Sequence, residues 1–170
     1  RWLTSAESAG GGNNEKGELM TNQHIMSIAM RQSALDLNAD ISDFTKEENV
    51  FVKSGLGALA RKYYKEPIAC NFVSYGSNVV ASVKDEFKEI VETYLSKFEF
   101  YHCFETPNMH WLDERMKEKG YRVCFMAEYF LPDMERLKRL ECNYVLKVLE
   151  QKDFADLYLP MWGNALCADR

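Results

Sequence analysis

The densest group of chemically reactive side chains lies between positions 102 and 110. It consists of His102, Cys103, Glu105 and His110. A cysteine beside histidine and glutamate could form a nucleophilic system of the thiol-hydrolase kind, provided that Cys103 and His110 meet in space. A zinc site is less favoured, because the spacing of these ligands matches no common zinc pattern. Free cysteine is among the most buried residue types, so we expect Cys103 and Cys124 to be core neighbours.

Two glutamates lie at the ends of apolar runs that we expect to be strands. Glu105 follows the run 100–104, and Glu128 lies near the end of the run 121–130. A carboxylate in such a place could hold a cationic amine of a substrate, and Tyr129 could line the same pocket. The alternative is that both glutamates are ordinary exposed side chains, as most charged residues are. Glu105, Glu128 and Tyr129 are therefore candidate substrate-binding residues.

The segment Ser54–Ala60 contains the pattern G-x-G-x-x-A between an expected strand and an expected helix. In dinucleotide-binding proteins, this pattern needs an acidic residue about 20 positions further on, at the end of a parallel strand. No aspartate or glutamate occurs between Glu66 and Asp85. We therefore expect a turn that leads into a helix, and not a dinucleotide site.

Composition excludes several classes of protein. The formal net charge of the 170 residues is −5, which disfavours nucleic acid and anionic membranes as partners. The five cysteines are an odd number without a C-x-x-C pair, which indicates a reducing, cytoplasmic location and no metal site. No apolar run approaches the roughly 20 residues that span a bilayer.

Periodicity predicts four helices. The segment 23–37 carries a stripe of Ile25, Ile28, Ala29 and Gln32, and 83–98 carries the clearest apolar stripe of the chain. A further helix covers Leu56–Tyr64. The fourth follows Thr106, with Pro107 in its first turn and Gly120 as its left-handed stop. Short helices are also expected at 134–140, where a linker is the alternative, and at 152–159.

About six strands are expected between these helices. They cover the ranges 49–53, 68–73, 78–83, 100–104, 121–130 and 144–149, and Ser74–Ser77 between the second and third reads as a hairpin turn. Strands interleaved with helices and including a hairpin indicate an α+β fold, with a mixed, largely antiparallel sheet and packed helices.

Several segments together resemble a known family. They are MRQSALDLNADISDF (30–44), ARKYY (60–64), CNFVSYGSNVVASV (70–83), YHCFETPNMHWLDERMKEKGYRVCFMAEYFLPD (101–133) and YVLKVLEQKDFADLYLPMWGNALCADR (144–170). Between Met20 and Arg170 the chain resembles the N-terminal half of a GNAT-type N-acetyltransferase, in the branch that includes the zwittermicin A resistance acetyltransferase.

The resemblance implies a domain organisation and an activity. Residues 1–19 would be a disordered or non-native leader, 20–141 an N-terminal α+β unit, and 142–170 the first strand and helix of a truncated acetyltransferase domain. The whole enzyme would transfer acetyl from acetyl-CoA to a small-molecule amine. Trp162 and Asn164 would lie in a segment that helps to shape the acceptor site.

The family binds acetyl-CoA through a loop of the form [Gln/Arg]-x-x-Gly-x-[Gly/Ala], whose backbone N–H groups hold the pyrophosphate. No glutamine or arginine of this chain has glycine three positions later. We therefore expect acetyl-CoA to be bound by a missing C-terminal domain, the fragment alone to be inactive, and no catalytic or cofactor-binding residue to lie in this chain. The rival interpretation is a standalone, non-catalytic α+β domain for binding or regulation.

Overall fold

The structure is a computed structural model. It describes residues 20–55, 57–61, 68–124, 126–138, 141–145, 147, 149–153, 157, 159 and 161. These residues belong to two compact units, one formed by Gln23–Leu131 and the other by the remaining residues, from Pro132 onward and up to Asn22. The larger unit contains all the strands among the described residues.

A small mixed sheet forms the centre of the unit Gln23–Leu131. Its strands are β1 (Val50–Lys53), β2 (Cys70–Val73) and β3 (Val80–Val83), in the spatial order β1-β3-β2. β1 runs parallel to β3, whereas β2 runs antiparallel to it. Each residue of β3 is buried, because this strand lies between the other two and has both faces covered. This arrangement confirms the predicted α+β class with a mixed sheet.

The connection between β2 and β3 is the predicted hairpin turn. Gly76 has φ +96°, a conformation that side chains with a Cβ rarely adopt, and the Ser74 hydroxyl accepts a hydrogen bond from its backbone N–H at 3.2 Å. The turn aligns Val73 with Val80 and Cys70 with Val83 across the pair of strands.

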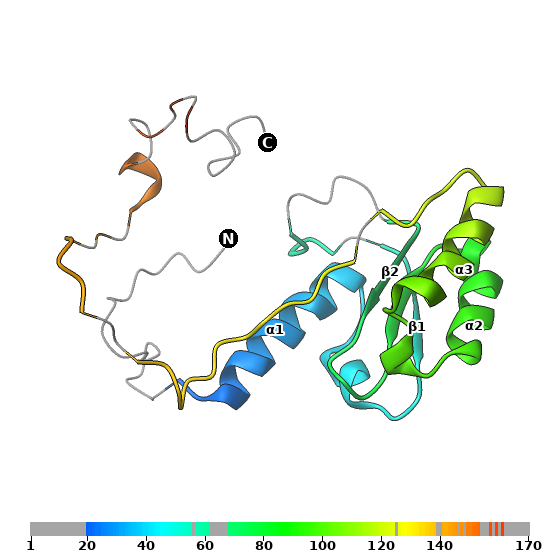
Figure 1. The fold of residues 1–170 in the computed structure, drawn as a ribbon, viewed down its shortest axis with the longest axis horizontal. Helices are drawn as coiled ribbons and strands as arrows, with labels where there is room; N and C mark the ends of the chain where they lie inside the picture. Colours follow the sequence, from blue (N-terminus) through cyan, green and yellow to red (C-terminus); the bar gives the residue numbers. More distant parts are fainter. Residues whose placement is uncertain are drawn as a thin grey trace. The chain divides into compact units, whose positions relative to one another are not determined.

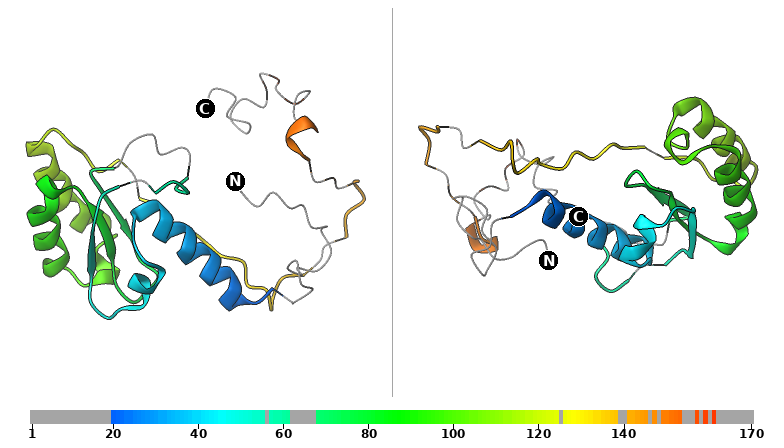
Figure 2. Two further views of the ribbon diagram at one scale, coloured as in Figure 1. Left: turned by 180° about the vertical axis from the view of Figure 1, so that it is seen from behind. Right: turned by 90° about the horizontal axis from the view of Figure 1, so that it is seen from below.

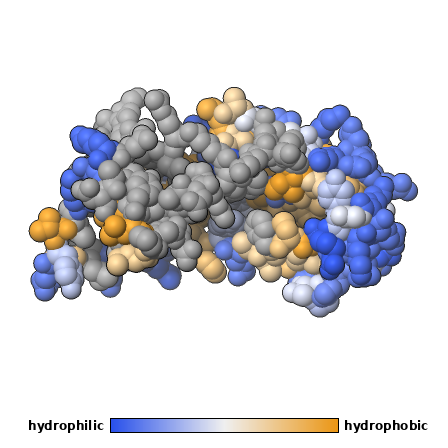
Figure 3. All heavy atoms as spheres, turned by 90° about the horizontal axis from the view of Figure 1, so that it is seen from above, coloured by the Kyte–Doolittle hydropathy of each residue, from blue (hydrophilic) through white to orange (hydrophobic). Residues whose placement is uncertain are grey.

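Helices cover both faces of this sheet (Figures 1 and 2). α1 (Asn22–Leu37) lies on one face, and α2 (Lys88–Lys97) and α3 (Thr106–Glu118) lie side by side on the other. Short 3₁₀ turns occur at Ile41–Thr45, Asp85–Phe87, Phe100–His102 and Gln151–Asp153. Hydrophilic side chains gather over α2 and α3, as expected for the outer faces of amphipathic helices (Figure 3).

The sheet separates two hydrophobic clusters, since alternate residues of a strand point to opposite faces. The larger cluster joins β3 to α2 and α3 through Val79, Ala81, Val83, Phe87, Val91, Tyr94, Leu95, Cys103, Leu112 and Met116. The smaller cluster joins β3 to α1 and the first 3₁₀ turn through Ala34, Leu37, Phe44 and Val80.

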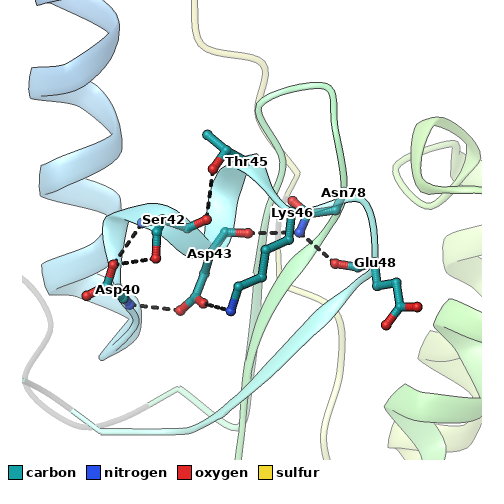
Figure 4. Close-up of polar contacts among 7 residues, drawn as sticks. All are labelled: Asp40, Ser42, Asp43, Thr45, Lys46, Glu48 and Asn78. Atoms are coloured by element: carbon teal, nitrogen blue, oxygen red, sulfur yellow. Dashed lines mark hydrogen bonds and ion pairs between the residues drawn. The ribbon is translucent and has the colours of Figure 1, made fainter.

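Polar contacts position β1 beside β3 (Figure 4). The buried Asn78 side chain donates from Nδ2 to the carbonyl oxygens of Asp43, at 2.9 Å, and Glu48, at 2.8 Å. The Asp43 carboxylate in turn accepts hydrogen bonds from the Asp40 backbone N–H and from Lys46 Nζ. Asn78, two residues before β3, is thereby hydrogen-bonded to two points of the segment that precedes β1, Asp43 and Glu48.

The predicted helices are largely confirmed, with two corrections. The stripe proposed for α1 is wrong, because its buried residues are Ser33, Ala34, Asp36 and Leu37, and Ile28 is 41% exposed. Its C-terminal turns alone reach the core. The helix predicted from 83 begins only at Lys88, because Val83 belongs to β3 and the extended Lys84 separates the strand from a 3₁₀ turn.

Among the described residues, three of the predicted strands are absent. Phe100–His102 form a 3₁₀ turn instead, in which the His102 N–H reaches Glu99 O at 2.8 Å, and 103–104 continue as a turn. Residues 121–130 have no strand pairing in their described part, and neither have the described residues of 144–149. The apolar composition of these runs resembles that of a buried strand, but a strand also requires a hydrogen-bonding neighbour.

Two further predicted helices lie partly outside the described residues. Ala58–Ala60 form a turn after Gly57, but Lys62–Pro67 are outside the described part, so the helix expected over Leu56–Tyr64 stays a prediction. The expected helix at 152–159 overlaps the 3₁₀ turn Gln151–Asp153, and part of it is likewise outside. Within the described residues 134–138 of the range 134–140, the structure has a turn over 134–136 and no helix, which agrees with the linker alternative.

Candidate functional site

The start of α3 brings together three exposed or half-buried polar side chains that the sequence separates by three residues each. We call His102, Glu105 and Asn108 the His102 cluster. His102 ends a 3₁₀ turn, Glu105 precedes the first residue of α3, and Asn108 lies in the first helical turn. The tight turn before α3 allows the first of these side chains to fold back onto the second, which a continuous strand over 100–104 would prevent.

The geometry of the cluster is that of a paired imidazole and carboxylate. His102 Nδ1 lies 2.7 Å from Glu105 Oε1. Asn108 Nδ2 donates to the His102 carbonyl oxygen at 2.9 Å and approaches Glu105 Oε2 at 3.4 Å. Because an ionised carboxylate only accepts hydrogen bonds, the His102 Nδ1–H is the donor of this pair. Both carboxylate oxygens of Glu105 thus have a partner, Oε1 the imidazole of His102 and Oε2 the amide of Asn108.

A buried residue anchors the cluster to the core. Cys103 is 1% exposed, and its thiol points back to the carbonyl oxygens of Phe98, at 3.6 Å, and Glu99, at 3.4 Å. The Tyr94 hydroxyl, from α2, donates to the Cys103 carbonyl oxygen at 2.7 Å. The backbone on which His102 sits is therefore held by hydrogen bonds on its inner side.

The structure weakens the thiol-hydrolase hypothesis. Burial raises the pKa of the Cys103 thiol to about 11, with a further contribution from Glu99. A reactive cysteine needs an accessible thiolate in an electropositive environment, and Cys103 has neither the exposure nor the charge. Its neighbour Glu105 pairs with His102 and not with the thiol.

No group of three or more potential metal ligands is assembled among the described residues. Burial, with a smaller contribution from Cys124, raises the pKa of the Cys70 thiol to about 11. The expected core contact between Cys103 and Cys124 is not found, since Cys124 is exposed.

The other predicted site residues lie elsewhere. Glu128 is exposed in the extended segment after α3, and Tyr129 beside it is 73% exposed. No hydrogen bond, ion pair or ring contact joins either of them to Glu105 within the described part of the chain. Trp162 and Asn164 lie outside the described residues.

A structural contact directly follows the glycine pattern at 54–60. The Arg61 backbone N–H donates to Asp36 Oδ1 at 2.9 Å, and Arg61 Nε pairs with Asp36 Oδ2. Gln32 Nε2 also donates to this carboxylate, whose side chain is fully buried. In a dinucleotide site, backbone N–H groups of this region would bind a phosphate. Here the Arg61 N–H binds the carboxylate of Asp36 from α1 instead.

A hollow of ≈ 350 Å³ lies at the C-terminal end of α2. Its lining combines apolar side chains with glutamates and comprises Glu47, Glu48, Asn49, Leu95, Ser96, Lys97, Phe98, Glu99 and Phe100. The 3₁₀ turn that carries His102 starts at this lining, because the His102 backbone N–H donates to Glu99 O.

Comparisons with protein-family models, with curated protein sequences and with solved structures give no match. Within the described residues, no helix has both the length and the apolar composition that crossing a bilayer requires. The arguments on function therefore depend on the residues of this chain.

Proposed function

We propose that this chain is the acceptor-side part of a GNAT-type N-acetyltransferase, which transfers acetyl from acetyl-CoA to a small-molecule amine. The resemblance of the segment 101–133 to this family supports the proposal. The observation that carries it is that this segment presents the His102–Glu105 pair at the exposed start of α3, 2.7 Å apart. A carboxylate and an imidazole at an accessible surface suit an amine, which must be attracted as a cation and must react as a neutral base.

The resemblance, together with the missing cofactor loop, suggests which substrate each part of the enzyme would bind. Acetyl-CoA would be bound by further sequence of the natural protein, because no segment here has the pyrophosphate-binding pattern of the family. The present chain would supply the wall on which the acceptor rests. Glu128 and Tyr129 in the extended segment, together with Trp162 and Asn164, remain candidates for that wall.

The test is acetyl transfer by the natural protein that contains this chain. The protein is incubated with acetyl-CoA and a panel of amino acids, polyamines and amine-containing antibiotics, and the products are identified by mass spectrometry. We expect one class of amine to be acetylated at the expense of acetyl-CoA. Failure to acetylate any amine in the panel, by a folded protein that binds acetyl-CoA, would contradict the proposal.

Acceptor kinetics of Glu128→Gln then show whether the extended segment reaches the substrate. If Glu128 contacts the acceptor, the KM for a cationic amine rises while the KM for acetyl-CoA stays unchanged, because the carboxylate attracts the amine and does not touch the cosubstrate. Unchanged acceptor kinetics would identify Glu128 as an ordinary exposed side chain.

The rival function, a non-catalytic binding domain, is favoured by the missing cofactor loop alone. It predicts that the natural protein does not bind acetyl-CoA. Calorimetric titration distinguishes the two, since micromolar affinity corresponds to about 8 kcal/mol and requires a formed site.

A further inference from the structure

His102 is the side chain of the cluster whose remaining nitrogen is available to a ligand. Its side chain is 46% exposed, and its Nδ1 is taken up by Glu105. No described residue makes a hydrogen bond to its Nε2. The ring of Tyr101, which is 59% exposed, lies beside it with 4.4 Å between the ring centroids.

We propose that His102 is a catalytic residue that removes a proton from the ammonium group of the acceptor through Nε2, and that Glu105 is the residue that positions its ring. This inference rests on the proposed acetyl transfer. It gives Glu105 a different part from the one expected from the sequence, where its carboxylate was a candidate to hold the amine directly.

The tautomer of His102 follows from its partner. A neutral imidazole carries one proton, and the hydrogen bond made by one nitrogen decides where that proton resides. Glu105 Oε1 accepts from Nδ1, so the proton is on Nδ1 and the lone pair is on Nε2. The nitrogen that faces away from the carboxylate is therefore the basic one.

The position of Glu105 is fixed as well. Asn108 Nδ2 contacts its second oxygen at 3.4 Å and donates to the His102 carbonyl at 2.9 Å. The amide thus connects the carboxylate to the backbone of the residue that it orients. When Nε2 gains a proton, His102 becomes an imidazolium beside this carboxylate. The negative charge of Glu105 then stabilises the positive charge of the ring.

The proposed step balances in protons and electrons. One N–H bond of the acceptor ammonium breaks, its electron pair stays on nitrogen, and the proton joins His102 Nε2. The neutral amine then forms a bond to the acetyl carbonyl carbon of acetyl-CoA, and the C–S bond breaks with its electron pair on sulfur. The departing thiolate takes a second proton from the amine nitrogen, and the imidazolium returns its proton to water.

The experiment measures kcat/KM for acetylation by the natural protein that contains this chain, with the amine identified above. General base catalysis contributes typically 10²–10⁴-fold, so we expect His102→Ala to lower kcat/KM by about 100-fold. Free imidazole should restore part of the lost rate, because it can occupy the space left by the side chain and accept the same proton. A purely structural role for His102 would show no such rescue.

Two further variants accompany this one. His102→Asn keeps a donor toward Glu105 but has no equivalent of Nε2, so we expect it to lose as much activity as His102→Ala. It provides the test if His102→Ala fails to fold. Glu105→Gln keeps an acceptor for Nδ1 but removes the negative charge. We expect it to lower kcat/KM by about tenfold, which is less than the effect of either His102 variant. The control is His110→Ala, which changes an exposed histidine of α3 outside the cluster.

The direct readout is the tautomer, measured by ¹⁵N chemical shifts of selectively labelled histidine in the same protein. We expect the shift of a protonated Nδ1 for His102 and a loss of this bias in Glu105→Ala. Normal kinetics in both His102 variants, with an active wild type, would overturn the role of His102 and leave the proposed function intact. A wild type without acetyl transfer would overturn both.

Discussion

Asn78 Nδ2 donates a hydrogen bond to the Glu48 carbonyl oxygen at 2.8 Å, across 30 residues of sequence. Together with the bond from the same nitrogen to Asp43 O, it ties the start of β3 to the loop before β1. β1 is joined to β3 as a parallel neighbour, and a parallel pair cannot be closed by a tight turn. The Asn78 amide therefore contributes to placing an edge strand that no hairpin positions.

Asn78→Asp tests this role. A carboxylate has no proton to donate at pH 7, so two carbonyl oxygens would face a buried negative charge. We expect the free energy of unfolding to fall by about 3 kcal/mol or more, measured by urea titration. Ser77→Asp is the control, because it adds the same charge at an exposed position one residue away and should change stability by less than about 0.5 kcal/mol. Equal effects of the two changes would contradict the role of the amide.

The sequence predicted the parts of this fold that depend on local signals. The hairpin at Gly76 and the stop of α3 at Gly120, with φ +79°, need a left-handed residue, and glycine supplies it visibly. The strand assignment at 100–104 failed because the apolar residues of a short run can also pack against one core from a 3₁₀ turn and the turn that follows it, as Phe100, Cys103 and Phe104 do. Whether 121–130 forms a strand depends on a neighbour, which periodicity does not reveal.

The candidate site was predicted only in part, because the strand assignment at 100–104 was wrong. The sequence identified His102 and Glu105 as reactive neighbours but considered His102 for thiol and metal chemistry, and Glu105 as a ligand of the amine. Their pairing required the turn that the strand assignment had replaced. The i, i+3 spacing of His102, Glu105 and Asn108 around Pro107 was the available signal, because side chains three apart are neighbours at the start of a helix.

The buried pair of Asp36 and Arg61 gives a second prediction. The Asp36 side chain is fully buried and accepts from the Arg61 backbone and guanidinium. Removal of one partner of a buried pair leaves the other without compensation, so we expect Asp36→Ala to cost about 3 kcal/mol in the free energy of unfolding.

The control for that change is the exposed pair of Lys53 and Asp85, whose side chains are 74% and 75% exposed. Asp85→Ala should cost no more than about 1 kcal/mol in the same urea titration, because water screens this pair. A loss of similar size in both variants would show that the Asp36 contact does not fix the turn at 57–61 to α1.

The Cys103 thiol gives a third prediction, on alkaline stability. Burial raises its pKa from 9.0 to about 11. The folded protein keeps this proton at a pH where the unfolded chain has lost it, so its stabilising effect is complete below about pH 9 and is lost as the pH rises through 11. Over this window we expect the wild type to lose about 2 kcal/mol relative to Cys103→Ala, which has no thiol to titrate.

The measurement is urea unfolding of both proteins between pH 8 and pH 11. Tyr94 and Cys70, whose pKa values burial also raises, are present in both proteins. Cys103 contributes to the raised pKa of Tyr94 only after burial, so the difference between the two proteins comes mainly from the Cys103 thiol. A difference between wild type and variant that does not change with pH would show that the thiol is accessible enough to ionise freely. That result would revive the thiol hypothesis.

The last prediction concerns the contact that holds the start of the extended segment after α3. Asp113 of α3 accepts two hydrogen bonds from Arg122 Nε, at 3.0 and 3.1 Å, and one from Nη2 at 2.8 Å. It also accepts from the Val123 backbone N–H at 2.8 Å. These donors, Arg122 first, hold the pKa of the Asp113 carboxyl below its usual value of 3.8.

A lowered carboxyl pKa means that the contact stabilises the folded state above the unfolded pKa of 3.8 and is lost as the pH falls through the lower, folded value. We therefore expect the Val123 amide to be protected from hydrogen exchange at neutral pH and to lose this protection below pH 3.8. Asp113→Asn should lower the protection at neutral pH and abolish its acid dependence, because the amide of asparagine does not titrate. Glu118→Gln, at the exposed end of the same helix, should behave as the wild type. Protection factors, corrected for the intrinsic effect of pH on exchange, provide the measurement, and the same acid dependence in Asp113→Asn would show that another group holds Val123.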